Sequence, residues 1–203
     1  MLKRNAIKII ATCAMAASAG GFLTACSKGK PEFRGVDISE VEYARDIALT
    51  DHNGQPRSLK DFRGKVVVVF FGYTQCPDVC PTTLQEMAEV KKMLGQDGDK
   101  LQSIFVTVDP ERDTLDMLKA YMGNFDPTFL ALRGTPEQTA AVAKDFKIYY
   151  KKVDGKTPTS YTMDHSAGSY IYDTQGRLRV YYRYGSGAEA LATDVKILLK
   201  EAG

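Results

Sequence analysis

The stretch that decides the fold is VVVVFFGYTQCPDVCP, residues 66–81. Its first six residues are apolar on both faces of an extended chain, which is typical of a strand that is covered on both sides. Two cysteines four positions apart, Cys76 and Cys80, follow this strand directly. A helical pattern of apolar residues then runs from Thr82 to Leu94. The stretch therefore predicts a central strand, a cysteine-bearing loop and a helix in direct succession.

The rest of the chain alternates between strand and helix patterns. An Asn-Gly turn at 53–54 indicates a first hairpin, and Thr135-Pro136-Glu137-Gln138 has the capping pattern of a helix start. The predicted elements are a hairpin of Ala44–Thr50 and Pro56–Leu59, a second buried strand at Leu101–Val108, helices at Leu115–Tyr121 and from Pro136 to about Lys147, a second hairpin of Ser169–Tyr172 and Leu178–Tyr184, and a helix at Ala188–Leu199. This order predicts an α/β, thioredoxin-like fold with an added N-terminal β-hairpin and a C-terminal hairpin plus helix.

The N-terminus has the pattern of a bacterial lipoprotein signal. Positive charges precede a small and apolar run from Ile9 to Leu23, which is shorter than the ~20 residues that span a bilayer as a helix. The run ends in Leu23-Thr24-Ala25-Cys26, which resembles a lipobox, where cleavage before the cysteine is followed by lipid attachment to its sulfur. An ordinary signal peptide with an incidental cysteine is the alternative.

We expect residues 1–25 to be the signal, 26–40 a tether from the lipidated Cys26, and 41–203 the domain. The domain then lies on the periplasmic, extracytoplasmic side of a bacterial membrane. The signal holds three of the 27 Lys and Arg residues and none of the 25 Asp and Glu residues, so the mature chain carries a net charge of −1. This balance gives no support for nucleic-acid binding.

Processing would leave the mature chain with only two free thiols. Cys13 is removed with the signal and Cys26 is consumed by lipid, so Cys76 and Cys80 have no partners for a larger disulfide framework. The pair can close a small Cys76–Cys80 disulfide or hold a soft metal ion. Pro81 fits a helix only in its first turn, which predicts a helix start at Cys80 or Pro81 with Cys76 in the preceding loop. A helix start favours a thiolate.

A metal site needs a third ligand, and the chain has two histidines. His52 lies at the tip of the first predicted hairpin and is interpreted as a solvated turn residue. His165 lies in a loop-like stretch before the second hairpin, and in a thioredoxin-like topology this position is beside the cysteines. Two thiolates and one imidazole suit Cu(I), or Cu(II) with one further donor. Zinc usually takes a closed set of four ligands, and no third cysteine remains.

Three motifs in order resemble the Sco/SenC family of copper-delivery proteins. They are Gly72-Tyr73-Thr74 with Cys76-Pro77-Asp78-Val79-Cys80-Pro81, then Asp109-Pro110-Glu111-Arg112-Asp113-Thr114, then Met163-Asp164-His165-Ser166 followed by Tyr170 and Asp173-Thr174-Gln175-Gly176. The resemblance implies a thioredoxin-like fold, copper bound by Cys76, Cys80 and His165, and a role in maturing the dinuclear copper centre of cytochrome oxidase. Gln75 departs from the histidine that many relatives carry there, which removes no ligand of this set.

Other residues of these motifs have two interpretations each. Asp78 and Asp164 can tune the site from behind its ligands or can simply cap loops. The 109–114 segment can shape the rim of the site, but we interpret it first as a strand end followed by a helix cap at Asp113 or Thr114.

Two functions fit this reading of the motifs. A metallochaperone passes copper to a copper-containing subunit of cytochrome c oxidase or to another apo-cuproprotein, and it is not an enzyme. A thiol–disulfide oxidoreductase instead reduces the cysteines of the acceptor, and a thioredoxin-like reductant then restores the Cys76–Cys80 pair. A peroxiredoxin is disfavoured because Thr74 is two residues, not three, before Cys76 and Phe70 stands at the expected proline.

Overall fold

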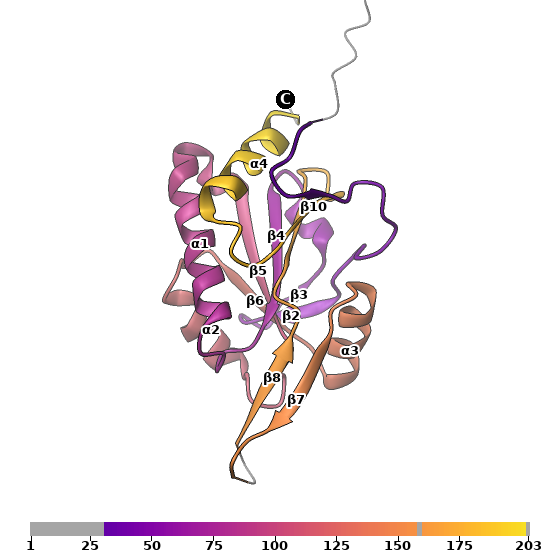
Figure 1. Ribbon diagram of the computed structural model, residues 1–203, viewed down its shortest axis with the longest axis vertical. Coiled ribbons are helices and arrows are strands. Elements are labelled where there is room, and N and C mark those ends of the chain that lie inside the picture. Colours follow the sequence, from indigo (N-terminus) through magenta and orange to yellow (C-terminus); the bar gives the residue numbers. More distant parts are fainter. Residues whose placement is uncertain (1–30, 158–159, 202–203) are drawn as a thin grey trace, which may run out of the picture. The chain divides into compact units, whose positions relative to one another are not determined.

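A mixed eight-stranded sheet forms the centre of the fold (Figure 1). The computed structural model describes residues 31–157 and 160–201. The strands lie in the order β1-β10-β9-β4-β5-β6-β2-β3. Their bounds are β1 Val36–Asp37, β2 Leu49–Asp51, β3 Pro56–Arg57, β4 Val66–Gly72, β5 Leu101–Thr107, β6 Leu130–Arg133, β9 Ser169–Tyr172 and β10 Leu178–Tyr182. All seven residues of β4 are buried, with β5 parallel on one side and β9 antiparallel on the other. The predicted central strand is confirmed.

Helices cover both faces of the sheet. The side chains of β4 point alternately to the two faces and are all apolar, so both faces have to be covered. Val66, Val68 and Phe70 face one core cluster, which also contains residues of α1 (Val79–Leu94), α2 (Leu115–Gly123) and α4 (Ala188–Lys200). The alternate residues of β4 face a second cluster with α3 (Pro136–Asp145) and the short 3₁₀ helix η1 (Leu59–Phe62). A second 3₁₀ helix, η2 (Gly95–Lys100), leads from α1 into β5. The predicted α/β, thioredoxin-like architecture is confirmed.

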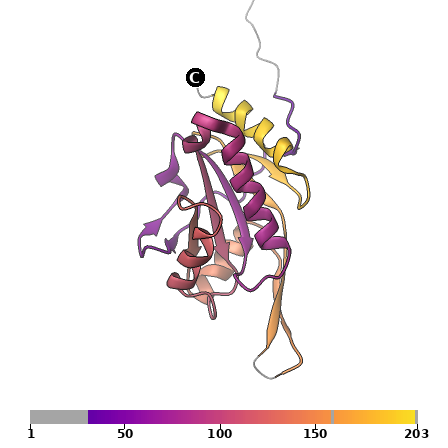
Figure 2. The ribbon, with the colours of Figure 1, turned by 90° about the vertical axis from the view of Figure 1, so that its left-hand side faces the viewer.

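A separate hairpin of β7 (Tyr150–Asp154) and β8 (Tyr161–His165) is absent from the elements that the sequence predicts. Figure 2 shows it extending beyond the end of the central sheet. All residues of β7 after Tyr150 are exposed, so no apolar alternation reveals the strand. The loop-like interpretation of the stretch around His165 is therefore wrong, because residues 161–165 are a strand.

His52 is buried, which corrects its interpretation as a solvated turn residue. Its side chain accepts a hydrogen bond at Nδ1 from the Ala131 N–H at 3.1 Å, and its own backbone N–H donates to the Ala131 carbonyl at 2.9 Å. Burial is the largest cause that lowers the pKa of His52. The sequence reading missed β6, which pairs with β2 and covers this residue.

Part of the segment expected as a tether packs onto the domain. β1 pairs with β10, and Phe33 packs against the core cluster around α1 and α4. The sequence-based boundary at residue 41 leaves this strand outside the domain. The predicted signal, Cys26 and the rest of residues 1–30 lie outside the described residues. Within the residues that are described, no helix is both long enough and apolar enough to cross a membrane.

A buried carboxylate on α4 holds this N-terminal segment. Asp194 is fully buried and accepts hydrogen bonds from the Arg34 and Gly35 backbone N–H groups at 2.9 Å and from the Tyr182 hydroxyl at 2.6 Å. Three donors from two parts of the chain therefore converge on one side chain. Charged hydrogen bonds of this kind contribute more to stability than neutral ones.

Replacing Asp194 with alanine is expected to lower the free energy of unfolding by about 2–4 kcal/mol, because three donors lose a buried charged acceptor. Urea unfolding measures the difference. Glu189→Ala removes the same charge from an exposed position on the same helix, and its cost should stay within about 1 kcal/mol. Equal losses in the two variants would contradict the anchoring role of Asp194.

Candidate metal centre

The end of β4 and the start of α1 place the two cysteines. The helix begins at Val79, so Cys80 is its second residue and Pro81 lies in the first turn, where proline is tolerated. Cys76 lies in the preceding loop, as predicted, and its N–H donates to the Tyr73 carbonyl at 3.2 Å. Cys80 is buried, Cys76 is half-buried, and both are free thiols.

Gly72 lets the buried thiol come close to the sheet. A Cβ at this position would lie 2.6 Å from Cys80 Sγ and 2.7 Å from the Phe105 ring. Both distances are shorter than any ordinary van der Waals contact. The absence of a side chain at Gly72 therefore makes the space that Cys80 occupies beside β4.

His165 brings its imidazole to the thiols from the end of β8. Its Nε2 lies 3.5 Å from Cys80 Sγ, and its Nδ1 lies 2.9 Å from the Ser166 carbonyl oxygen. Because a carbonyl only accepts, Nδ1 carries the hydrogen in this contact, and Nε2 is the ring nitrogen that faces the sulfur. The Tyr73 ring contacts the imidazole edge-on, with centroids 5.8 Å apart. The ring is thus held in the orientation and tautomer that a metal ligand needs.

The two thiols differ strongly in acidity. A hydrogen bond from the Cys80 thiol is the largest cause that lowers the pKa of Cys76, to about 4, and the backbone N–H groups of Asp78 and Cys80 act in the same direction. The same hydrogen bond and burial raise the pKa of Cys80 well above its ordinary value. Cys76 is therefore the more acidic thiol of the pair.

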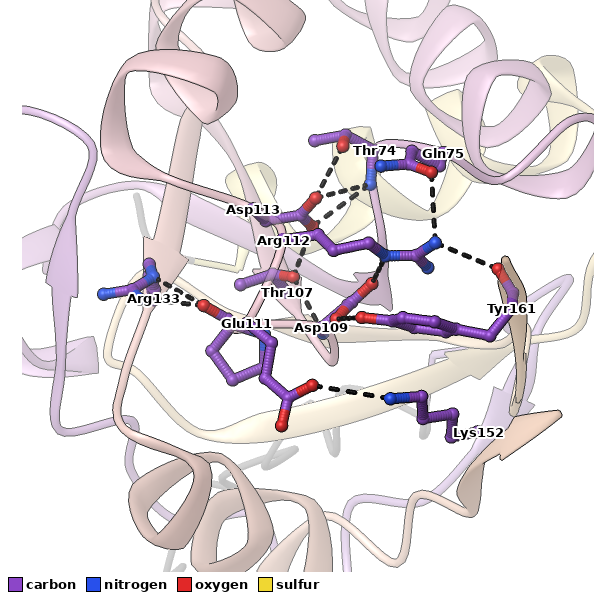
Figure 3. A network of polar contacts seen from close by, with 11 residues as sticks. Thr74, Gln75, Thr107, Asp109, Glu111, Arg112, Asp113, Arg133, Lys152 and Tyr161 are labelled. Carbon is purple, nitrogen blue, oxygen red and sulfur yellow. Dashed lines mark hydrogen bonds and ion pairs between the residues drawn. The ribbon is translucent and has the colours of Figure 1, made fainter. Parts of the chain in front are cut away.

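Asp113 ties the cysteine loop to the end of β5 (Figure 3). It is fully buried and accepts hydrogen bonds from the Thr74 N–H at 3.1 Å and from the Thr74 and Thr107 hydroxyls at 2.5 Å. Burial raises the pKa of this carboxyl in spite of these donors. Of the two helix caps that the sequence predicts, Asp113 and Thr114, it is Thr114 that caps α2, with its side chain accepting from the Met117 N–H. The sequence signal for Asp113 was two threonines, Thr107 at the end of β5 and Thr74 two residues after the end of β4.

One donor set results from these elements. The sulfurs of Cys76 and Cys80 and a ring nitrogen of His165 all lie within 4.8 Å of one another. Two ligand atoms at ~2.3 Å from one ion are at most ~4.6 Å apart, so the loop that carries Cys76 has to move little to close around a metal. Two sulfurs and one imidazole are the soft donors that favour copper.

Comparison with known proteins identifies the family. The family model described as SCO1/SenC matches residues 37–200. The chain belongs to the SCO1/SenC family. A SCO2-like protein of Rickettsia felis is 33% identical over 197 residues, covering 94% of this chain and 96% of the relative. The mitochondrial SCO2 homolog of Mus musculus is 36% identical over 153 residues, which are 74% of this chain and 60% of that protein's length.

A solved structure of this family carries the metal. Bradyrhizobium japonicum ScoI with copper bound is 43% identical, with a TM-score of 0.69, and the match covers 75% of this chain and 97% of that one. The fold of the present SCO1/SenC protein is therefore that of a relative that holds copper.

The SCO1/SenC chain does not bring its two motif aspartates into the donor set. Asp78 is the N-cap residue of α1 and is exposed, and its side chain makes no capping hydrogen bond. Asp164 is exposed on β8, opposite Lys151 of β7. Because neighbouring strand residues point to opposite faces, its side chain points away from that of His165. Gly72, Tyr73 and Asp113 support the site. The sequence analysis names all three as motif residues, but it gives Gly72 and Tyr73 no role in the site and considers Asp113 only at its rim or as a helix cap.

Proposed function

We propose that this protein is a membrane-anchored, extracytoplasmic copper metallochaperone that holds copper through Cys76, Cys80 and His165. The observation that carries the proposal is the convergence of these three donors within 4.8 Å from a loop, a helix start and a strand end 85 residues further on. The copper-bound relative supports the choice of metal.

The three ligands have different parts in binding and releasing copper. Cys76 offers a thiolate that is already formed, while Cys80 must lose its proton to solvent when the metal arrives. His165 contributes Nε2, the ring nitrogen that lies 3.5 Å from Cys80 Sγ. Since Cys76 is the half-buried sulfur and Cys80 the buried one, we place the entry of copper, and its exchange onto an acceptor's ligands, at Cys76.

The expected acceptor is the copper-containing subunit of cytochrome c oxidase or another apo-cuproprotein. The family motifs support this acceptor, and the pattern at Leu23–Cys26 supports a lipid anchor at Cys26 on the periplasmic side of a bacterial membrane. An anchored carrier meets a membrane-bound acceptor by diffusion along the membrane surface.

The acidity of Cys76 favours a second candidate function. In a thiol–disulfide oxidoreductase the Cys76 thiolate attacks an acceptor disulfide, and the Cys80 thiolate then resolves the mixed disulfide after losing its proton. The acceptor gains two electrons from this chain, one proton that Cys80 loses and a second proton from solvent, and this chain is left with a Cys76–Cys80 disulfide. A thioredoxin-like reductant would restore the pair. His165 has no part in this sequence.

Anaerobic titration of the reduced protein with Cu(I) and Cu(II) tests the proposed function. One equivalent of copper should bind, and the Cu(II) form should show a sulfur-to-copper charge-transfer band. A Cys76→Ser, Cys80→Ser double variant serves as the control and should lose the band. Absence of stoichiometric binding in the wild type would reject the metallochaperone and favour the oxidoreductase.

A further inference from the structure

Arg112 links the cysteine loop to the strand that carries His165 (Figure 3). Its Nη1 donates to Gln75 Oε1 at 3.1 Å and to the Tyr161 backbone carbonyl at 2.9 Å. Gln75 directly precedes Cys76, and Tyr161 is the first residue of β8, which ends at His165. One guanidinium nitrogen therefore touches both parts of the chain that supply the donor set.

Arg112 also contacts Tyr161 and Asp109, and these two residues contact each other. Its guanidinium lies over the Tyr161 ring, with Cζ 3.4 Å from the ring centroid, and its Nε donates to a carboxylate oxygen of Asp109. The Tyr161 hydroxyl donates to the other oxygen of Asp109 at 2.8 Å. The side chains of Arg112 and Asp109 are only 18% and 3% exposed. A part-buried, stacked guanidinium that donates from both Nε and Nη1 needs the planar fork of arginine.

The hairpin needs such a link because it has few anchors of its own. β7 and β8 form a two-stranded sheet that is not paired with the central sheet. Within it, Met163 is the one buried residue, and a two-stranded hairpin alone is marginally stable. The distance from the imidazole to the thiols therefore depends on contacts that hold β8 to the domain. Arg112 makes such a contact at Tyr161, at the loop end of β8 and four residues before His165. Cζ of Arg112 also lies 5.8 Å from the centroid of the Tyr73 ring, and this ring contacts His165.

We propose that Arg112 is a positioning residue of the copper site, which holds β8 against the cysteine loop and so keeps His165 within reach of a metal bound to the two sulfurs. The inference rests on the proposed function, and it gives the 109–114 segment a role beyond ending a strand and starting a helix.

Arg112→Met keeps the length and apolar contact of the side chain but removes its charge and hydrogen bonds. We expect its Cu(II) affinity to fall about 10- to 100-fold, the range for loss of a residue that orients a ligand. In pulsed EPR the nitrogen coupling of the imidazole to Cu(II) should weaken, whereas the thiolate charge-transfer band persists. In the metal-free protein, hydrogen exchange of the β8 amides should rise at least about 10-fold. Arg112→Lys keeps the charge without the fork and should lie between Met and the wild type.

Arg133→Met is the matched control. Arg133 reaches the same loop from its other side, where Nε and Nη2 donate to the Pro110 carbonyl at 3.2 and 2.8 Å (Figure 3). If Arg112 merely stabilises this loop, the two variants will behave alike, and that result overturns the proposal. The proposal is also overturned if Arg112→Met keeps the wild-type imidazole nitrogen coupling, the wild-type Cu(II) affinity or the wild-type hydrogen exchange of the β8 amides. If Arg112→Met does not fold, the same measurements on Arg112→Lys decide. Failure of the wild type to bind copper would instead reject the proposed function.

Discussion

Replacing His165 with alanine is expected to lower the affinity of the reduced protein for Cu(II) by more than about 100-fold, since the change removes a ligand and not only a group that orients one. The imidazole nitrogen coupling should disappear from the EPR spectrum. The two thiols should keep most of their chemistry, because the hydrogen bond from Cys80 is the largest cause of the low pKa of Cys76. The variant therefore separates copper binding from dithiol reactivity.

The same variant decides between the two functions in cells. Under the metallochaperone proposal, His165→Ala blocks assembly of an active oxidase, while the rate at which Cys76 reacts with an alkylating reagent stays near the wild-type value. Normal oxidase assembly in this variant would contradict copper delivery and favour the oxidoreductase. Asp164→Ala is the matched control, because the residue is adjacent but exposed on the opposite face of β8. It should leave copper binding and assembly unchanged, and a loss there would restore Asp164 as a residue that tunes the site.

The sequence predicts the central strand and the cysteine loop well because the conformation of both is determined by neighbouring residues in the chain. Six consecutive apolar residues describe a covered strand, and Pro81 limits where α1 can begin. The donor set was predictable too, since the chain offers only two histidines and a thioredoxin-like topology places one of them near the thiols.

The parts that sequence reasoning missed depend on contacts between distant segments. β7 has an exposed, lysine-containing sequence and exists because it pairs with β8. His52 is buried by β6, an unpredicted strand. Arg112 and Asp113 look like surface loop residues until the fold brings Tyr161 and Thr74 beside them. Local patterns carry no information on such partners.

Replacing Cys80 with alanine is expected to raise the pKa of Cys76, because it removes the donor whose hydrogen bond is the largest cause of the low value. In the wild type, with a pKa of about 4 for Cys76, the thiolate is fully formed at neutral pH. Its alkylation rate should therefore be flat between about pH 6 and 8 and fall only under acidic conditions. In Cys80→Ala the midpoint should move upward by more than about 1 unit, toward the ordinary cysteine value of ~8.5.

Cys80→Ser is the matched variant, since its hydroxyl keeps a hydrogen-bond donor at nearly the same place. Its profile should stay closer to the wild type than that of Cys80→Ala, although both variants lose the second sulfur and with it the copper site and the disulfide. A wild-type profile in Cys80→Ala would mean that the Asp78 and Cys80 backbone N–H groups and the start of α1 suffice to hold the Cys76 thiolate. Copper would then meet two independent sulfurs. With the predicted shift, the buried Cys80 thiol stabilises the Cys76 thiolate, which would offer copper its first sulfur ligand.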